Sequence, residues 1–195
     1  MKETILLADF KEIELLRTLA YHHQNTVGLR VFDSFTLAKE ALIRNGIIVN
    51  DLLGREEEAY IIHSFLKEIP YFSSSTFEDS GNMADALYLL RSLIPEEEEK
   101  TIHTRFPGET FRMKNESITE VYDLYTKNKG SRKDRIDIIR MAIRECGPMN
   151  CEFAVLEEKQ LTPLEEKLLD RLSSGSFRTV SAVGLFHKTP GVYRN

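Results

Sequence analysis

The stretch Glu3–Ala20 constrains the fold of this chain more than any other. It opens with the apolar run Ile5–Ala8, and a run of that length between polar residues is typical of a strand buried on both faces. Asp9 follows and predicts the cap of a helix with one apolar side. The sequence therefore predicts the strand, turn and helix with which an open α/β sheet begins.

The turn between that strand and helix lacks the residues that bind phosphate in many sheets of this kind. A phosphate-binding turn is rich in glycine, because backbone amides must approach the phosphate oxygens. Here the turn reads Ala8-Asp9-Phe10-Lys11 and contains no glycine. Lys11 alone cannot cradle a phosphate without backbone amides turned toward it. We therefore expect a nucleotide-binding type of fold without its nucleotide site, and no cofactor.

The remaining elements predict an α/β sheet with a helical insertion. Val27–Phe32 and Cys151–Leu156 are strand candidates, whereas residues 52–145 between them show helical periodicity. We predict an α/β portion made of residues 1–50 and 150–195, and a helical subdomain over residues 51–149. The expected helices of that subdomain run from Arg55 to Ile69, from Asp79 or Ser80 to Ile94, from Asn115 to Lys127 and from Lys133 to Glu145.

Helix caps give the sharpest local predictions. Ser34 is expected to cap the helix that follows the second strand. Thr162, with Pro163 at the first helical position and Glu165 as the reciprocal acid, predicts a capped helix after the third strand. Phe177–Phe186 predicts a weak final strand, and the aperiodic tail after it leads us to expect a longer natural protein.

Composition excludes some classes of protein. The chain has 195 residues, 42% of them hydrophobic and 29% charged, which is typical of a soluble globular domain. We find no apolar run long enough to span a membrane and no signal peptide, so we expect a cytoplasmic protein without a membrane partner. The two cysteines, Cys146 and Cys151, have neither redox-pair nor zinc-site spacing, and we expect two unpaired thiols.

A basic segment, residues 127–144, lies in a chain whose net charge is −5. The overall charge argues against a surface that binds polyanions everywhere, but it allows a local patch. The candidate DNA-binding residues in this segment are Lys127, Lys129, Arg132 and Lys133. Contact with phosphate is one interpretation of this segment, and a solvated helix face is the other, which we favour.

Other polar and aromatic residues have two interpretations each. Asp134 and Asp137 are spaced like paired catalytic carboxylates, but surface ion pairs with Lys133, Arg135 and Arg140 explain them better. Tyr122 and Tyr125 have the spacing of a stacking platform for single-stranded nucleic acid, or of core residues on a helix, which we favour. The glutamates of residues 96–99 are expected to form a solvated face. No phosphate loop, nucleophile elbow or metal motif is present, so we predict no catalytic, cofactor-binding or metal-binding residues.

Several phrases of the sequence resemble a known family. They are TILLADFKEIELLRTLA, GLRVFDSFTLAKEAL, EIPYFSSSTFEDSGNMADALYLLRSLIPEEE, FRMKNESITEVYDLYTKNKGSRKDRIDIIRMAI and LTPLEEKLLDRLSSG. In this order they resemble the N-terminal region of bacterial PD-(D/E)XK nuclease-family proteins related to the B subunit of AddAB-type helicase–nucleases. The most specific pieces are Pro70-Tyr71-Phe72, Phe111 with Lys114-Asn115, Val121-Tyr122 with Tyr125, and Asp134-Arg135-Ile136-Asp137.

The resemblance covers residues 3–175 and implies a P-loop or helicase-like core with an inserted helical subdomain. It implies degenerate helicase motifs here and a nuclease far downstream, so this region would scaffold a DNA repair or recombination enzyme and guide DNA. An alternative is a protein-interaction module that binds a partner subunit. A third possibility is a small-molecule enzyme with Asp9 and Asp33 at the carboxyl ends of its first two strands.

Overall fold

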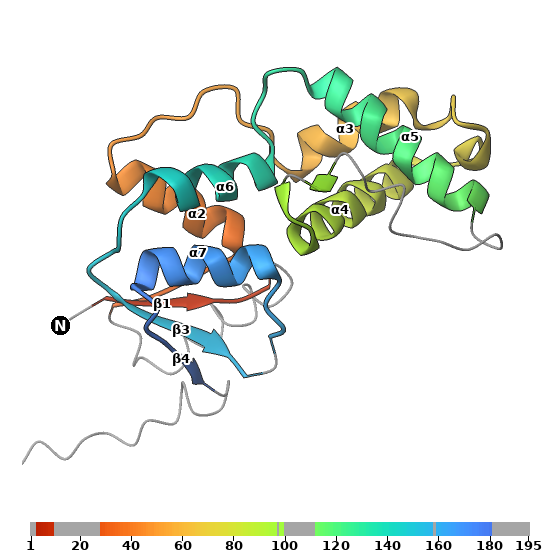
Figure 1. Ribbon diagram of the computed structural model, residues 1–195. Helices are drawn as coiled ribbons and strands as arrows, with labels where there is room; N and C mark the ends of the chain where they lie inside the picture. Colours follow the sequence, from red (N-terminus) through yellow and green to blue (C-terminus); the bar gives the residue numbers. More distant parts are fainter. Residues whose placement is uncertain (1–2, 10–27, 97, 100–111, 158, 181–195) are drawn as a thin grey trace, which may run out of the picture. The chain divides into compact units, whose positions relative to one another are not determined.

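The computed structural model divides the chain into two compact units (Figure 1). It describes all residues except 1–2, 10–27, 97, 100–111, 158 and 181–195. An α/β unit contains residues 1–48 and 139–195, and a helical unit contains residues 49–138. The predicted boundaries lay at residues 50 and 149, so the second division comes 11 residues earlier than expected, inside a helix. The predicted helix that begins at Asp9 lies outside the described residues.

Four parallel strands form the sheet of the α/β unit. They are β1 (Thr4–Leu7), β2 (Leu29–Phe32), β3 (Glu152–Leu156) and β4 (Phe177–Val180), in the order β2-β1-β3-β4. This is the order of the first four strands in flavodoxin-like doubly wound sheets. The chain moves from β1 to β2 on one side and returns with β3 on the other side, so the switch point lies between β1 and β3.

The first strand is the centre of this sheet, as its apolar run predicts. Leu6 pairs with Val31 of β2 and with Ala154 of β3. Ile5, Leu6 and Leu7 are fully buried, because both edges of β1 are paired and both of its faces are covered. The predicted α/β fold class with a parallel sheet is therefore confirmed.

Two helices of the α/β unit begin at side-chain caps. Helix α2 (Ser34–Arg44) is capped by Asp33, whose carboxylate accepts a hydrogen bond from the Thr36 amide at 2.6 Å. The prediction of Ser34 as the cap was therefore wrong by one residue. Helix α7 (Pro163–Ser173) begins with the predicted capping box, in which Thr162 and Glu165 bond to each other's amides. Strand β4 confirms the start of the final predicted strand, whose residues 181–186 lie outside the described residues.

The helical unit contains α3 (Arg55–Leu66), the short 3₁₀ helix η1 (Pro70–Phe72), α4 (Phe77–Leu93) and α5 (Arg112–Lys129). Helix α6 (Arg135–Glu145) starts in this unit and continues into the α/β unit. Helix α4 starts earlier than expected, because Thr76 forms a capping box with Asp79 at the end of the predicted loop. No helix within the described part of the chain has the length and apolar character needed to cross a membrane.

A separate apolar core holds α3, α4 and α5 together. Its buried members are Ala59, Ile62, Phe65, Leu66, Ile69, Ala84, Leu87, Val121 and Tyr125. Tyr125 belongs to this core, which confirms the structural interpretation of its helical spacing. Tyr122 is half-buried and packs against the same cluster.

Candidate functional site

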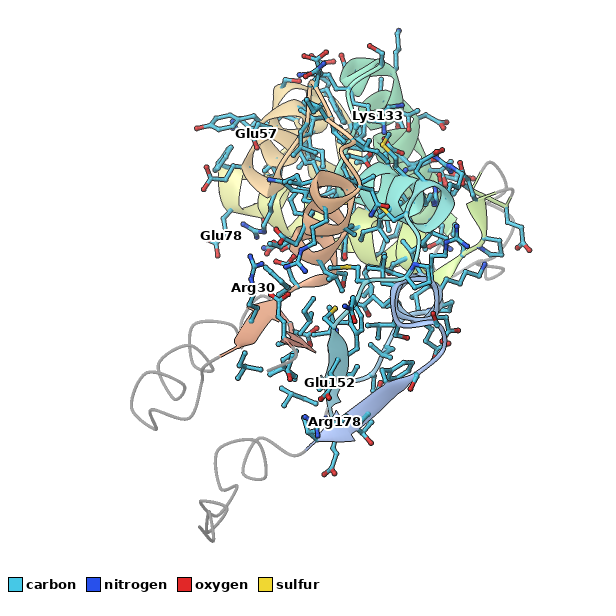
Figure 2. The ribbon with its side chains drawn as sticks, turned by 90° about the vertical axis from the view of Figure 1, so that its left-hand side faces the viewer. Arg30, Glu57, Glu78, Lys133, Glu152 and Arg178 are labelled. Atoms are coloured by element: carbon cyan, nitrogen blue, oxygen red, sulfur yellow. The ribbon has the colours of Figure 1, made fainter. Side chains whose placement is uncertain are left out.

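The turn between α5 and α6 carries the four candidate DNA-binding residues. Lys127 and Lys133 are exposed there, and Lys133 lies on the outside of the helical unit (Figure 2). Arg132 is partly buried, and its guanidinium donates to the carbonyl oxygens of Asn128 at 2.8 Å and Lys129 at 3.0 Å. These carbonyls end α5, so Arg132 satisfies acceptors that the helix leaves unbonded.

Lys129 differs from its neighbours because it points into the helical unit. Only 8% of it is exposed. Its ammonium donates to Asp134 at 2.7 Å and also contacts Asp137. A phosphate would have to compete with two carboxylates for this ammonium, so the turn offers Lys127 and Lys133 as its accessible ammonium groups.

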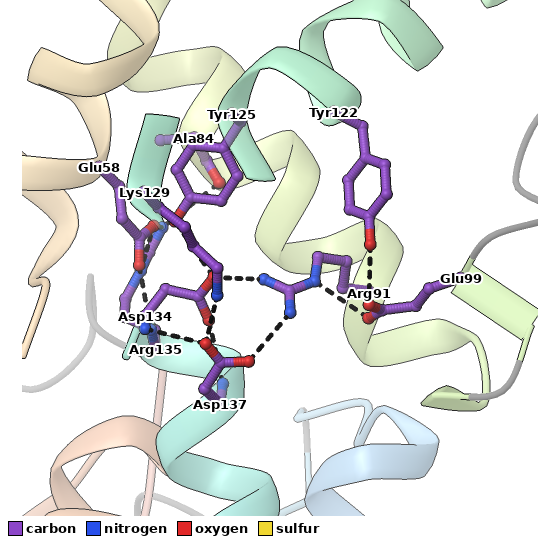
Figure 3. A network of polar contacts seen from close by, with 10 residues as sticks. All are labelled: Glu58, Ala84, Arg91, Glu99, Tyr122, Tyr125, Lys129, Asp134, Arg135 and Asp137. Carbon is purple, nitrogen blue, oxygen red and sulfur yellow. Dashed lines mark hydrogen bonds and ion pairs between the residues drawn. The ribbon is translucent and has the colours of Figure 1, made fainter. Parts of the chain in front are cut away.

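Asp134 is the centre of a buried network of charges (Figure 3). It accepts hydrogen bonds from Arg91 at 2.6 Å, from Lys129 at 2.7 Å and from the Tyr125 hydroxyl at 3.2 Å. It also caps α6, since it accepts from the Asp137 amide at 3.0 Å. The prediction of surface ion pairs for Asp134 was therefore wrong in two respects. Asp134 is buried, and it forms ion pairs with Arg91 and Lys129.

Arg91 extends the network to Glu99. Its Nε donates to Glu99 at 3.0 Å, and Glu99 also accepts from the Tyr122 hydroxyl at 2.9 Å. The prediction of a solvated face for residues 96–99 is wrong at Glu99, which is buried by these contacts. Burial and the neighbouring carboxylate of Glu99 raise the pKa of Tyr122 to about 12.

Arg135 forms a second part of the network, on the side of α3. It donates to Glu58 at 2.8 Å and to Asp85 at 3.3 Å, and Asp85 accepts from Arg55 at 2.8 Å. Burial raises the pKa of Glu58, and the hydrogen bond from Arg135 does not fully offset it. The contacts of Arg135 thus join α6 to α3 and α4.

The electrostatics of this network favour an architectural role. Burial by itself raises the pKa of Asp134, but the charges of Arg91 and Lys129 outweigh it and hold that pKa well below its usual range. A general acid or base works best with a pKa near the operating pH, and Asp134 is shifted away from it. Asp134 and Asp137, whose spacing resembles that of paired catalytic carboxylates, are therefore structural residues: Asp134 caps α6 and forms ion pairs with the buried Arg91 and Lys129.

A second polar cluster lies in the α/β unit, where β1 and β3 end. Only 3% of the Lys159 side chain is exposed. Its ammonium contacts Asp9 and lies 3.1 Å from the Glu165 carboxylate. Glu165 also accepts a hydrogen bond from the Ser34 hydroxyl. Burial opposes the charge on Lys159, but the two carboxylates outweigh it and raise the pKa of that ammonium.

This second cluster bears on the possibility of a small-molecule enzyme. Ligands of doubly wound sheets bind beside the carboxyl ends of the strands at the switch point, which is where Asp9 and Lys159 lie. Asp33, the other carboxylate of that hypothesis, is engaged as the cap of α2. Both aspartates therefore have structural partners.

Neither the cysteines nor the acidic residues form a metal site within the described part of the chain. Cys146 and Cys151 are buried, and no disulfide bond joins these two thiols, as expected. Burial raises the pKa of the Cys146 thiol, which disfavours the reactive thiolate. Across the residues that the structure describes, no three His, Cys, Asp or Glu side chains gather in a geometry that could hold a metal ion.

An apolar groove lies on the helical unit, between α4 and α5. It has a volume of about 490 Å³. The last turns of α4 contribute Leu89, Leu90 and Leu93 to its wall, and the first turns of α5 contribute Lys114 and Ile118. Leu89 and Leu93, one helical turn apart on α4, remain 52% and 50% exposed.

Sequence reasoning missed Arg91, Glu99, Lys159 and Glu165 as network members. One signal was available: Asp134-Arg135-Ile136-Asp137 has the spacing of a capping box before an apolar run. Arg91 and Asp134 are 43 positions apart, and no local pattern connects them.

Comparison with known proteins adds no family to these observations. No protein-family model matches the chain. No curated protein matches it either.

Proposed function

We propose that the chain is a helicase-like domain without ATPase activity and belongs to a DNA repair or recombination helicase–nuclease. Its role there is to scaffold the enzyme and to guide DNA. The main observation behind the proposal is that the helical unit is inserted in the sequence of the α/β unit. The chain leaves a parallel sheet after β2 and α2, builds a helical unit, and returns to the sheet at β3. This order supports a helicase-like core with a helical insertion, which the sequence resemblance implies.

The proposal assigns no nucleotide to the carboxyl end of β1. The carboxylates of Asp9 and Glu165 share the Lys159 ammonium there, and both would repel a phosphate. We expect neither hydrolysis of ATP nor binding of a fluorescent ATP analogue by the isolated chain. ATP hydrolysis by the purified chain would contradict the proposal.

DNA guiding is assigned to the exposed ammonium groups of Lys127 and Lys133. Two contacts with phosphates of a single strand predict a salt slope of about −1.4, or about a sevenfold loss of affinity for a fourfold rise in salt. A titration of fluorescein-labelled single-stranded DNA at about 50 mM and about 200 mM salt measures this slope.

Charge-reversal variants test whether DNA binds at this turn or elsewhere on the surface. The double variant Lys127→Glu/Lys133→Glu is expected to abolish the binding. The matched control Lys67→Glu/Lys167→Glu reverses two other exposed lysines and is expected to keep most of it. Equal losses in both variants would contradict a DNA contact at this turn.

A second candidate function is a protein-interaction module. The groove between α4 and α5 favours it, because exposed apolar side chains beside a groove are typical of binding sites for other proteins. This function predicts no binding of DNA at low salt, which distinguishes it from the first.

A further inference from the structure

Three aromatic side chains gather on the surface of the helical unit, where α3 packs against the start of α4. The Phe77 ring lies between the other two, with its centroid 4.9 Å from that of Tyr60 and 5.3 Å from that of His63. Tyr60 is 64% exposed, and Phe77 is 43% exposed. We call these three residues the aromatic patch. Aromatic side chains are enriched where proteins contact one another, so the patch is a candidate contact surface.

Local structure holds the aromatic patch in place. Phe77 is the first residue of α4, which begins at a capping box. The Nδ1 atom of His63 lies at hydrogen-bond distance, 3.3 Å, from the hydroxyl of the buried Ser80. Tyr60 precedes His63 by three positions, so the two rings share a face of α3. Because the rings are held in place by the fold, a partner that binds them loses little of the free energy of binding to ordering them.

Other aromatic rings of the chain are covered by its own cations. An arginine guanidinium lies 4.8 Å from the ring centre of Phe32 and another lies 4.6 Å from that of Tyr88, while a lysine ammonium lies 5.4 Å from that of Phe35. Within the described part of the chain, no lysine or arginine lies over the ring of Tyr60 or of Phe77. The exposed faces of these two rings can therefore attract a cation from another molecule.

Carboxylates surround the aromatic patch. Glu56 and Glu57 precede Tyr60 by four and three positions on α3, so they lie on the neighbouring turn. Glu78 follows Phe77 on α4, and Figure 2 shows Glu57 and Glu78 on the same side of the helical unit. Glu56 and Glu78 form no ion pair with any other described residue. These charges repel the phosphates of a nucleic acid, so among ligands that stack on aromatic rings they favour a cation.

Arginine suits the aromatic patch better than lysine does. A guanidinium is planar, so it stacks on a ring and still donates to carboxylates at its edge, whereas an ammonium is a compact and strongly hydrated charge. The basic residues at the two ends of α3 do not supply this cation. Arg55 pairs with Asp85 at 2.8 Å, and Lys67 lies seven positions beyond Tyr60, about two helical turns away.

We infer that the aromatic patch binds an arginine side chain that a basic segment of a partner protein presents. The guanidinium stacks on the exposed rings of Tyr60 and Phe77, and the carboxylates of Glu56 and Glu78 balance its charge. The inference rests on the second candidate function, the protein-interaction module, and names the chemistry of its partner. It does not depend on the contact with DNA proposed above.

The test measures the binding of short labelled peptides to the full chain. The first peptide has arginines spaced among glycine and serine. The second has citrulline at the same positions, because citrulline keeps the shape of arginine without its charge, and the third has lysine there. Fluorescence anisotropy is expected to show at least fivefold tighter binding of the arginine peptide than of the citrulline peptide. The lysine peptide has the same charge as the arginine peptide and is expected to bind at least twofold more weakly than it does.

Variants of the chain locate the binding site. Tyr60→Leu/Phe77→Leu removes two exposed rings without changing the net charge, and it is expected to weaken the arginine peptide at least fivefold. Glu56→Gln/Glu78→Gln keeps the rings and is expected to weaken the same peptide at least threefold. The matched control Tyr71→Leu removes another exposed ring, which is 49% exposed, and should change no affinity. Thermal unfolding checks that each variant is folded.

Three outcomes would overturn the inference. Equal affinity for the arginine and citrulline peptides, or no binding of either, would refute the recognition of a cation. An equal loss in Tyr71→Leu and in Tyr60→Leu/Phe77→Leu would exclude the aromatic patch as the site. Binding of single-stranded DNA that Tyr60→Leu/Phe77→Leu abolishes would make a nucleobase the occupant. The DNA titration of Lys127→Glu/Lys133→Glu tests the first proposed function separately, so either proposal can fail without the other.

Discussion

Lys127 and Lys129 are two residues apart, yet they belong to different kinds of structure. Lys127 is exposed on the last turn of α5, whereas Lys129 is buried with its ammonium on Asp134 and Asp137. The basic turn, Lys127 to Lys133, therefore presents charge to solvent on one side and supplies charge to the buried network on the other. The number of basic residues in a segment therefore does not give the positive charge that is accessible to a ligand.

The buried network also differs from the basic turn in what its residues hold together. Asp134 links α6 to α4 through Arg91 and to α5 through Lys129. Among the described residues, the side chains of Lys127 and Lys133 have no comparable role: the backbone of Lys133 forms hydrogen bonds with Asp51 and Leu53, but its ammonium is exposed. We therefore expect mutations in the network to affect stability and mutations at the exposed lysines to affect binding.

The largest effect is expected for Asp134→Asn. This change keeps the size of the side chain but removes the buried carboxylate charge that Arg91 and Lys129 share, and leaves them only the partly exposed Asp137 in common. Removing one partner of a buried ion pair costs about 3–5 kcal/mol, and we expect a loss of that size in urea-induced unfolding. A loss below about 1 kcal/mol, the size typical of an exposed pair, would remove the distinction between network and turn.

Acid is expected to weaken the same network more gradually. The folded-state pKa of Asp134 is depressed, so its contribution to stability is complete above the unfolded-state value of about 3.9 and is lost as the pH falls further. Glu58 acts in the opposite sense: its pKa is raised, so it favours the folded state less as the pH rises above its unfolded value. Unfolding curves between neutral pH and about pH 3 should show a steeper acid loss in the wild type than in Asp134→Asn. Parallel curves would show that Asp134 does not govern the acid limb.

The smallest effect on stability is expected for Lys127→Gln and Lys133→Gln. Both side chains are exposed, and surface substitutions of this kind usually change the free energy of unfolding by less than about 0.5 kcal/mol. Thermal unfolding of both variants should therefore match the wild type. A clear destabilisation by either change would assign that lysine to the architecture rather than to the accessible surface.

The sequence predicted those parts of the fold that depend on neighbouring residues. The apolar run of β1, the Thr162–Glu165 capping box and the alternation of strands with helices all act over a few positions, and each was recognised. The start of α4 was missed although Thr76 and Asp79 have capping spacing, because the preceding serines resembled a loop.

The candidate sites depend on contacts that no local pattern encodes. Lys159 reaches Asp9 across 150 positions, and Arg91 reaches Asp134 across 43. The burial of Lys129 follows from the packing of α5 and α6, and its neighbours in sequence give no sign of it. Sequence reasoning therefore located the basic turn but not the division between its buried and exposed charges.

Chemical labelling of lysine amines in the native chain tests this division most directly. Reductive methylation with formaldehyde, followed by mass spectrometry at successive times, gives the reaction rate of each lysine. We expect Lys127 and Lys133 to be modified early, and Lys129 to react only after unfolding, because its ammonium is buried between Asp134 and Asp137. Modification of Lys129 at the rate of Lys127 in the folded chain would contradict the account.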